Sequence, residues 1–390
     1  MRLFPFTSGT SLSVVLTLVV GLFVCMPYAV ADNNDLPNDE KLLVPQKNES
    51  LLWTEAWKMV KVGTLWYLSY GWGESVDGPF NDVRVGRGYF TVKFEPFKWF
   101  TPRITLDTHQ NDNGDWMARL KYVYGKFRLP IQTRWISDPG VEFGLVHTPW
   151  LDFEEHTNMY RMQGTMLMER NKLFNSADLG ITIGGLLGSK LNKDYQDRVN
   201  PKYPGRYGSF ALGIYNGGGY HAKEKNQNKV FQSRLSLRPF GGLFPGLQVS
   251  YLFIYGKGNT EQEPNWLVHD IMASFEHEYF VLTAQFATGQ GNQNGDMVDA
   301  QGRALDFKGL SAFAEIKLRR FMSSIMGRYD YWDWGVSDGS VSTQRFIGGY
   351  VFHFLKHNSI LVSFDGVTYS DQRPMTWEAK VTLQVHYPPK

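Results

Sequence analysis

The chain has 390 residues, and its 40 Lys and Arg residues nearly balance its 38 Asp and Glu residues. This near-neutral charge argues against a general nucleic-acid-binding protein, which needs a strongly basic surface. The single cysteine excludes a disulfide scaffold and a cysteine-ligated zinc site. Aromatic residues make up 15% of the chain, which is more than the core of a soluble protein needs. Hydrophobic residues make up 43%, which argues against a largely disordered chain.

Residues 1–31 have the three parts of a secretory signal peptide. Arg2 supplies a positive charge, an apolar run extends from Leu12 to Met26, and Ala29 and Ala31 form an A-x-A cleavage site. We predict export and cleavage after Ala31. A retained membrane anchor is the weaker alternative because the apolar run is short, and lipid attachment at Cys25 is weaker still because a bulky valine precedes it.

Residues 32–62 are predicted to form a separate N-terminal segment. Residues 32–50 are polar and are expected to be a tail. Between Leu51 and Lys61, apolar residues fall at helical spacing, which is compatible with a short amphipathic helix. A lead-in to the first strand is the other interpretation of this stretch.

From residue 63 onward the apolar pattern changes to a period of two, which is typical of β-strands with one apolar and one polar face. The last segment shows it best, because Trp377, Val381 and Val385 alternate with Glu378 and Lys380. About sixteen such segments are predicted, at 63–74, 82–94, 101–110, 115–129, 141–149, 177–187, 207–216, 229–239, 246–257, 266–277, 279–289, 307–318, 321–333, 342–355, 358–369 and 375–387.

Three features favour a membrane barrel over a soluble sandwich. Aromatic residues gather near the ends of the apolar faces, as at a membrane boundary. The polar faces carry too many charges to be buried without water, which indicates a water-filled interior. Short turns alternate with long loops in the second half, and only the connection 188–206 is long where a short turn is expected. We therefore predict an all-β fold, a transmembrane antiparallel barrel over residues 63–390, with residues 32–62 in the periplasm.

Several short motifs, in a particular order along the chain, are similar to the phosphate-selective porin O/P family. They are Thr148-Pro149 after a strand, Glu169-Arg170 in the following loop, Asp178 and Gly180 in the next strand, and Ala211, Gly213, Asn216 and Gly217 after that. The similarity extends over most of residues 82–387. It implies a homotrimeric outer-membrane porin of sixteen strands whose third loop folds inward as a constriction. The phosphate-binding lysines and arginine ladder of the family have no residue-by-residue match, which leaves the solute open.

The predicted constriction is the loop 151–176, although an outer loop that packs on itself or on another subunit is the alternative. Its four methionines are interpreted as packing residues. Arg234 and Arg238, like Arg119 and Lys121, share a strand face and form either a basic track for anions or ion pairs with Glu315, Asp330 or Glu378. The pore-lining or constriction candidates are Arg87, Arg119, Lys121, Arg161, Glu169, Arg170, Arg234, Arg238 and Arg328.

The sequence thus predicts a porin of the cell outer membrane through which small hydrophilic solutes, anions such as phosphate among them, diffuse passively. Its expected partners are outer-membrane lipids, small ions or solutes and two further copies of the chain, without nucleic acid. No enzyme motif occurs, so no catalytic residue, cofactor or metal is expected. The alternatives are a non-conducting barrel that acts as an adhesin or as a sheath for exported proteins, and a secreted β-rich enzyme.

Overall fold

The computed structural model describes residues 57–111, 113–335, 341–371 and 373–389. The predicted signal peptide, its cleavage site after Ala31 and the tail 32–50 lie outside the described residues. In the part of the range 51–61 that is described, only Trp57 and Lys58 are helical. The chain divides into a small unit, residues 1–61 with 94–96, and a large unit, residues 62–93 with 97–390.

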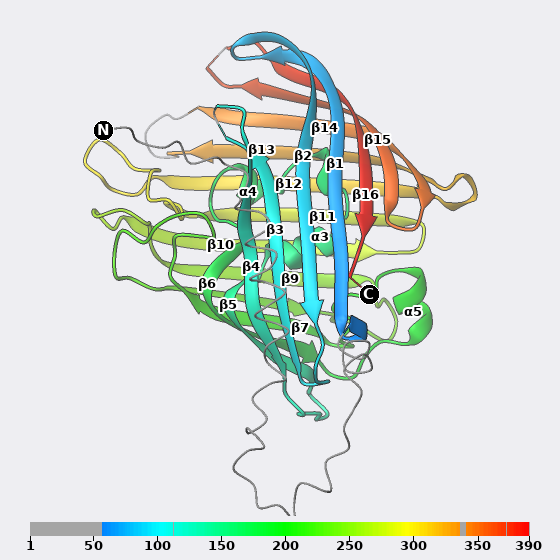
Figure 1. The fold of residues 1–390 in the computed structure, drawn as a ribbon. Helices are drawn as coiled ribbons and strands as arrows, with labels where there is room; N and C mark the ends of the chain where they lie inside the picture. The colour runs from blue at the N-terminus through cyan, green and yellow to red at the C-terminus, as the bar shows by residue number, and fades with distance from the viewer. Residues whose placement is uncertain (1–56, 112, 336–340, 372, 390) are drawn as a thin grey trace, which may run out of the picture. The chain divides into compact units, whose positions relative to one another are not determined.

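The described residues form sixteen antiparallel strands that close into a barrel, in which each strand pairs with its sequence neighbours and β1 pairs with β16 (Figure 1). Closure leaves no strand edge with unpaired backbone groups. The strands are β1 (Val60–Ser75), β2 (Gly78–Phe94), β3 (Phe100–Gln110), β4 (Trp116–Arg128), β5 (Ile136–His147), β6 (Ala177–Leu187), β7 (Gly208–Tyr215), β8 (Val230–Leu237), β9 (Leu247–Lys257), β10 (Asn265–Glu276), β11 (Phe280–Gln290), β12 (Asp306–Leu318), β13 (Ser323–Trp334), β14 (Ser342–Leu355), β15 (Asn358–Tyr369) and β16 (Thr376–Tyr387).

The sixteen predicted segments are confirmed, although β1 and β2 begin at Val60 and Gly78, before the predicted residues 63 and 82, and the largest difference in bounds lies at the fifth strand. The fifth strand begins at Ile136 rather than near residue 141. A β-bulge between Ser137 and Gly140 accommodates Pro139 and Asp138, so pairing with β6 continues on both sides of the proline. Proline has no N–H to donate and is tolerated in a sheet at such bulges. Because Pro139 interrupts the strand pattern, the sequence predicts a strand that begins only after it.

Connections alternate between the two ends of the barrel. At one end, here called the turn end, most are short, such as 277–279, 319–322 and 356–357. At the other, the loop end, they include 216–229, 258–264 and 291–305, so the predicted alternation in the second half is confirmed. The connection 188–207 lies at the turn end, is long, and contains the helix α5 (Lys193–Arg198).

The two faces of the sheet differ as the alternation predicts. On β13, Ile325 and Tyr329 lie on one face, and Ile325 is half exposed, whereas Met326, Arg328 and Asp330 on the other face are buried. The exposed face of most strands is apolar and aromatic, and the buried face carries most of the charges. In a closed barrel the buried face is the one that surrounds the interior, so most ionised strand residues face inward. Among the described residues, no helix combines the length and apolar character needed to cross a membrane.

Candidate functional site

The interior of the barrel is occupied in part by the connection 148–176 between β5 and β6, here called the third loop. It contains α3 (Leu151–Thr157), the 3₁₀ turn η4 (Arg161–Gln163) and α4 (Leu167–Arg170). Its side chains reach strands far away in the sequence. Tyr160 Oη donates to Glu315 Oε1 on β12 over 2.5 Å, and Arg170 Nη1 pairs with Asp330 Oδ2 on β13 over 2.5 Å. Both carboxylates belong to the buried strand face, so the third loop packs against that face.

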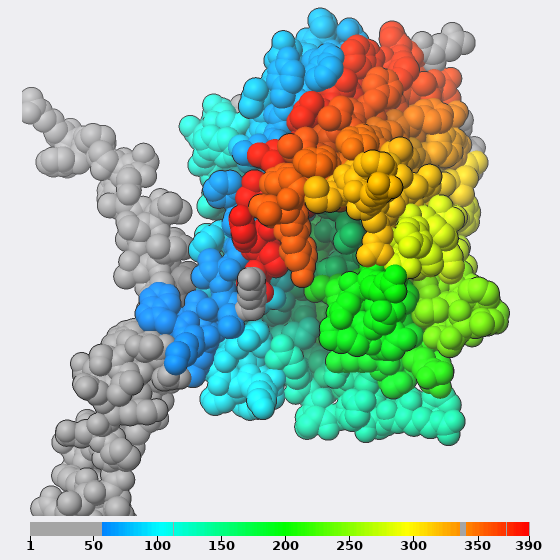
Figure 2. Space-filling model, turned by 90° about the vertical axis from the view of Figure 1, so that its right-hand side faces the viewer, coloured from blue at the N-terminus to red at the C-terminus, as the bar shows by residue number. Residues whose placement is uncertain are grey.

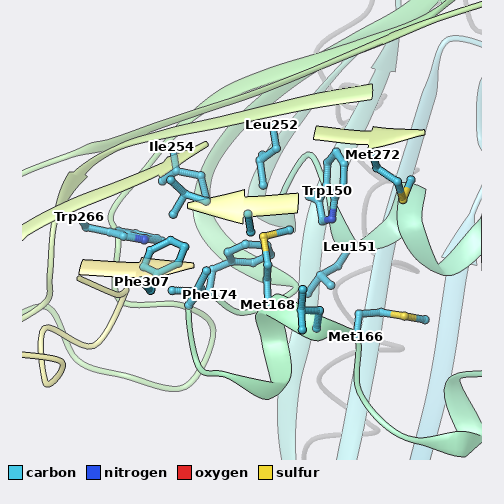
Figure 3. Packing of buried hydrophobic residues seen from close by; sticks show 14 of the residues in the cluster. Trp150, Leu151, Met166, Met168, Phe174, Leu252, Ile254, Trp266, Met272 and Phe307 are labelled. Atoms are coloured by element: carbon cyan, nitrogen blue, oxygen red, sulfur yellow. The ribbon is translucent and has the colours of Figure 1, made fainter. Parts of the chain in front are cut away.

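An apolar cluster holds the third loop to one wall (Figure 3). The loop contributes two groups of apolar residues. The first group lies in α3 and just before it, and the second lies between residues 166 and 174, in α4 and on either side of it. The strands β8 to β13 supply the other half. The members are Trp150, Leu151, Phe153, Met166, Leu167, Met168, Leu173 and Phe174 from the loop, and Val230, Leu252, Ile254, Trp266, Val268, Met272, Ala287, Phe307 and Trp332 from the strands.

The methionines of this loop behave largely as predicted. Met166 and Met168 are fully buried in the apolar cluster, and Met162 is buried in a second one beside Phe313. Met159 is exposed. Burial of flexible thioether side chains in irregular gaps is a packing role, so the packing interpretation is confirmed for three of the four.

The opposite wall, formed by β1 to β4, carries cations stacked on tyrosines. The guanidinium of Arg87 lies 4.8 Å from the ring centre of Tyr89 and 5.5 Å from that of Tyr67. Lys121 Nζ lies 4.6 Å from the ring centre of Tyr89 and donates to its hydroxyl over 2.6 Å. Such contacts attract cations to the negative ring face and fix their side chains.

Arg103 extends this row on β3. Its guanidinium lies 4.7 Å from the ring centre of Tyr122, which Lys121 also contacts at 5.7 Å. Among the described residues, Arg87, Arg103 and Lys121 form no ion pair with a carboxylate. We name these three residues and their tyrosines Tyr67, Tyr89, Tyr122 and Tyr124 the cationic wall.

A β-bulge explains why both Lys121 and Tyr122 belong to this wall. Thr105 pairs with Tyr122 and Leu106 with Leu120, which leaves Lys121 as the extra residue of β4. Both side chains of the Lys121-Tyr122 pair are buried, whereas strict alternation would send them to opposite faces. Arg87 and Lys121 were thus predicted from the sequence, whereas Arg103 and the tyrosines were not. The repeated tyrosines of this region, and the position of Arg103 on the same face of β3 as Asp107, are the signals that point to them.

The third loop presents charges toward the cationic wall. Arg161 pairs with Glu155 over 2.6 Å and with Glu169 over 2.5 Å, so one guanidinium joins both carboxylates. Glu155 and Glu169 also interact electrostatically with Arg87 and Lys121. The structure thus brings four of the predicted residues together, namely Arg87, Lys121, Arg161 and Glu169. Arg103 interacts in the same way with Asp152 on α3, so that across the whole group, counting Arg103 and Glu155, four cations face three carboxylates.

The other predicted residues have different surroundings. Arg119 pairs with Asp107 on the neighbouring β3 over 2.9 Å. Arg170 of the third loop and Arg328 of β13 share the carboxylate of Asp330, and Arg328 also donates to Thr165 O of the loop over 3.1 Å.

Arg234 and Arg238 are each 2% exposed and fit neither predicted alternative. Arg234 donates to Pro149 O over 3.0 Å, and Arg238 donates to Tyr203 O over 3.3 Å. They are thus neither part of an open track nor paired with Glu315, Asp330 or Glu378, because chain segments from two connections cover them.

At the loop end the interior contains a cavity of about 470 Å³. Three arginines line it, and each is paired with a carboxylate. Arg345 pairs with Asp365 over 2.5 Å, Arg170 pairs with Asp330, and Arg84 pairs with Glu378. These guanidinium charges are neutralised locally, unlike those of the cationic wall.

Two acidic residues of α3 have pKa shifts in opposite directions. Burial raises the pKa of Glu154 to about 7, against an opposing effect of Arg328, and its carboxylate accepts from Trp150 Nε1 over 2.8 Å. Asp152 has the reverse shift, because the imidazoles of His156 and His147 and a hydrogen bond from Tyr203 outweigh its burial and keep its pKa well below the usual range. Within the described residues no three His, Cys, Asp or Glu side chains are grouped so that they could hold a metal ion.

Comparison with solved structures finds outer-membrane channels. An anion-selective porin from Comamonas acidovorans matches with a TM-score of 0.58 at 8% identity, covering 84% of this chain and 99% of that chain. OmpF of Salmonella typhi matches with a TM-score of 0.55 at 12% identity, over 84% and 97% of the two chains. The outer-membrane channel DcaP of Acinetobacter baumannii matches with a TM-score of 0.52 at 9% identity, over the same shares.

At these identities the likeness establishes the fold, a closed sixteen-strand barrel of the outer-membrane porin type. No family model matches the chain, and no curated protein matches it. The resemblance to the phosphate-selective porin O/P family therefore stays a prediction from the motifs.

Proposed function

We propose that the chain is a porin of the outer membrane through which small hydrophilic solutes diffuse passively, with a preference for anions. The passage runs between the cationic wall and the third loop, and it narrows where Arg161, Glu155 and Glu169 face Arg87 and Lys121. The observation that carries this proposal is the row of three cations, Arg87, Arg103 and Lys121, that form no ion pair among the described residues.

The sign of the preference follows from the charge arrangement. A charged ring at a narrow point selects ions by its local field. Arg161 offsets part of the charge of Glu155 and Glu169, while the wall cations are held by neutral tyrosine rings that leave their charge intact. The net field at this point therefore favours anions, and phosphate is one solute of that class.

Export, outer-membrane localisation and trimer formation belong to the same proposal. The exposed apolar face supports contact with lipid. OmpT of Vibrio cholerae, which has the same fold, is described in a trimer form. For this chain the trimer is tested by the mass of the purified protein in detergent.

The decisive experiment is the reversal potential of the purified protein in a planar bilayer under a KCl gradient. We expect the wild type to conduct with a potential of the sign that anion preference gives. The double variant Arg87→Gln/Lys121→Gln should shift that potential toward cation preference. A control is Lys193→Gln, which removes one positive charge at an exposed position of α5.

Two outcomes contradict the proposal at different levels. A wild type that does not conduct refutes the porin function and favours the adhesin or sheath alternative. A wild type that conducts but prefers cations, or a double variant with an unchanged potential, refutes the role of the cationic wall alone.

A further inference from the structure

The connection 188–207 is anomalous, since turn-end connections of barrels are short and this one is as elaborate as a loop. It has its own internal structure. Leu191 N donates to Pro204 O over 2.7 Å, and Arg206 N donates to Ser189 O over 2.7 Å, which closes its base. Asn192 caps α5 by accepting from Tyr195 N over 2.9 Å. A turn with this much internal bonding has a defined position from which it can act on its neighbours.

Figure 2 shows the side on which α5 lies in Figure 1, and a hollow opens there beside the bright green surface of this connection. The connection contacts the third loop through two side chains. Asn200 Nδ2 donates to His156 O at the end of α3 over 2.9 Å and to Glu276 Oε1 on β10 over 2.6 Å. An amide nitrogen has two hydrogens, so Asn200 can make both bonds at once and join α3 to the barrel wall.

Tyr203 makes the second contact, at the start of α3. Its hydroxyl donates to the carboxylate of Asp152, and its ring meets that of Phe153 edge to face, with 5.4 Å between centres. Arg234 of β8 strengthens this contact, because its guanidinium lies 5.0 Å from the ring centre of Tyr203 and 4.3 Å from that of Phe153. Both ends of α3 are therefore held from the turn end.

The position of α3 matters because it carries Glu155. That carboxylate, paired with Arg161, faces Arg87 and Lys121 across the proposed passage. A shift of α3 moves the charged side of the passage relative to the cationic wall. The contacts of Asn200 and Tyr203 thus lead through α3 to Glu155, which belongs to the proposed constriction.

We propose that the connection 188–207 is a positioning element for the constriction, with Asn200 and Tyr203 as its positioning residues. This inference rests on the proposed porin function. The connection holds the third loop in place from the turn end of the barrel, whereas that loop enters the barrel from the loop end.

The test is single-channel recording of the full-length mature protein carrying Asn200→Ala/Tyr203→Phe. We expect a conductance clearly above that of the wild type, because α3 loses a hydrogen bond at each of its ends, and we expect larger polyethylene glycols to enter the pore. Current fluctuations should also increase, while the reversal potential keeps its sign because the cationic wall is untouched. The control is Lys193→Ala on the exposed face of α5, which should behave as wild type.

Tyr203→Phe alone retains the ring contact with Phe153 and replaces the double variant in the test if that variant does not fold. Its conductance should also exceed that of the wild type, but by a smaller amount. Folding is checked by heat-dependent migration in detergent gels. If the wild type conducts with anion preference and both variants match it in conductance and polymer exclusion, the positioning role is refuted while the porin function stands. A wild type without conductance refutes the porin function, and the positioning role falls with it.

Discussion

The two sides of the barrel interior differ in a way that explains where the third loop lies. The wall of β8 to β13 presents Leu252, Ile254, Trp266, Phe307 and other apolar side chains, and the loop covers them completely. The wall of β1 to β4 presents mainly arginine, lysine and tyrosine, and only Tyr67 and Leu65 of this wall join a cluster with the loop residues Tyr160 and Met162.

The free energies of apolar burial and of ion pairing explain why the loop packs mainly on the wall of β8 to β13. Full burial of one large apolar side chain stabilises by about 1.5–3 kcal/mol, and eight loop residues are buried in the cluster. The ion pairs of Arg161 with Glu155 and Glu169 are largely buried, and the cost of removing these charges from water offsets most of their mutual attraction. The third loop is therefore held to the wall of β8 to β13 mainly by apolar burial. Each of the following changes tests one part of this contrast.

Trp150→Ala should have the largest effect. Trp150 is fully buried between the loop and the wall, and its indole N–H donates to Glu154. Removal of such a ring leaves a cavity and costs about 3–5 kcal/mol, so we expect a clearly lower unfolding temperature, followed by heat-dependent gel migration, and a wider, noisier channel. Trp135→Ala, at an exposed position, is the control. Equal stability of both variants would show that the apolar cluster does not hold the loop.

Glu154 should make the stability of the loop depend on pH. Its pKa is raised from 4.5 to about 7 in the folded protein, so folding favours the protonated carboxyl. Its contribution is therefore fully present below about pH 4.5 and is lost as pH rises toward 7, a change of up to about 3 kcal/mol. Other titrating groups lie near it, among them Glu155, Asp270 and Asp330.

The measurement for Glu154 is therefore a difference between two proteins. The unfolding temperature of the wild type should fall relative to that of Glu154→Gln between pH 5 and pH 8, a range chosen around these pKa values. Parallel pH profiles of the two proteins would contradict a shifted pKa of Glu154.

Gly309→Ala should have the smallest effect of the three. Gly309 on β12 faces Trp332 on β13, and a Cβ atom there would lie 2.3 Å from the indole ring. The ring, which stacks on Phe307 at 5.1 Å, would have to move, at a cost of about 1–3 kcal/mol. Gly348→Ala on β14, where a Cβ atom meets nothing, is the control. Equal unfolding temperatures of the two variants would show that the wall tolerates the shift.

Much of the fold could be predicted because strands leave a local signature. The alternation of residues such as Trp377 and Val381 with Glu378 and Lys380 depends only on the period of the strand, and it gave sixteen segments close to the observed ones. The same alternation placed Arg87 and Lys121 on the inner face. It could not reveal Arg103 as their partner, because that association depends on the register of β3 against β4 and on the bulge at Lys121.

The amino-acid sequence by itself determined the strands, their number, the polarity of their two faces and the alternation of turns with loops, since each follows from neighbours in the chain. Tertiary structure decided which wall the third loop covers, which cations have no carboxylate partner within the described part of the chain, and what the long connection 188–207 contacts. Those outcomes depend on side chains that are far apart in sequence, such as Asn200 and Glu276 or Arg170 and Asp330, which meet only when the barrel closes around them.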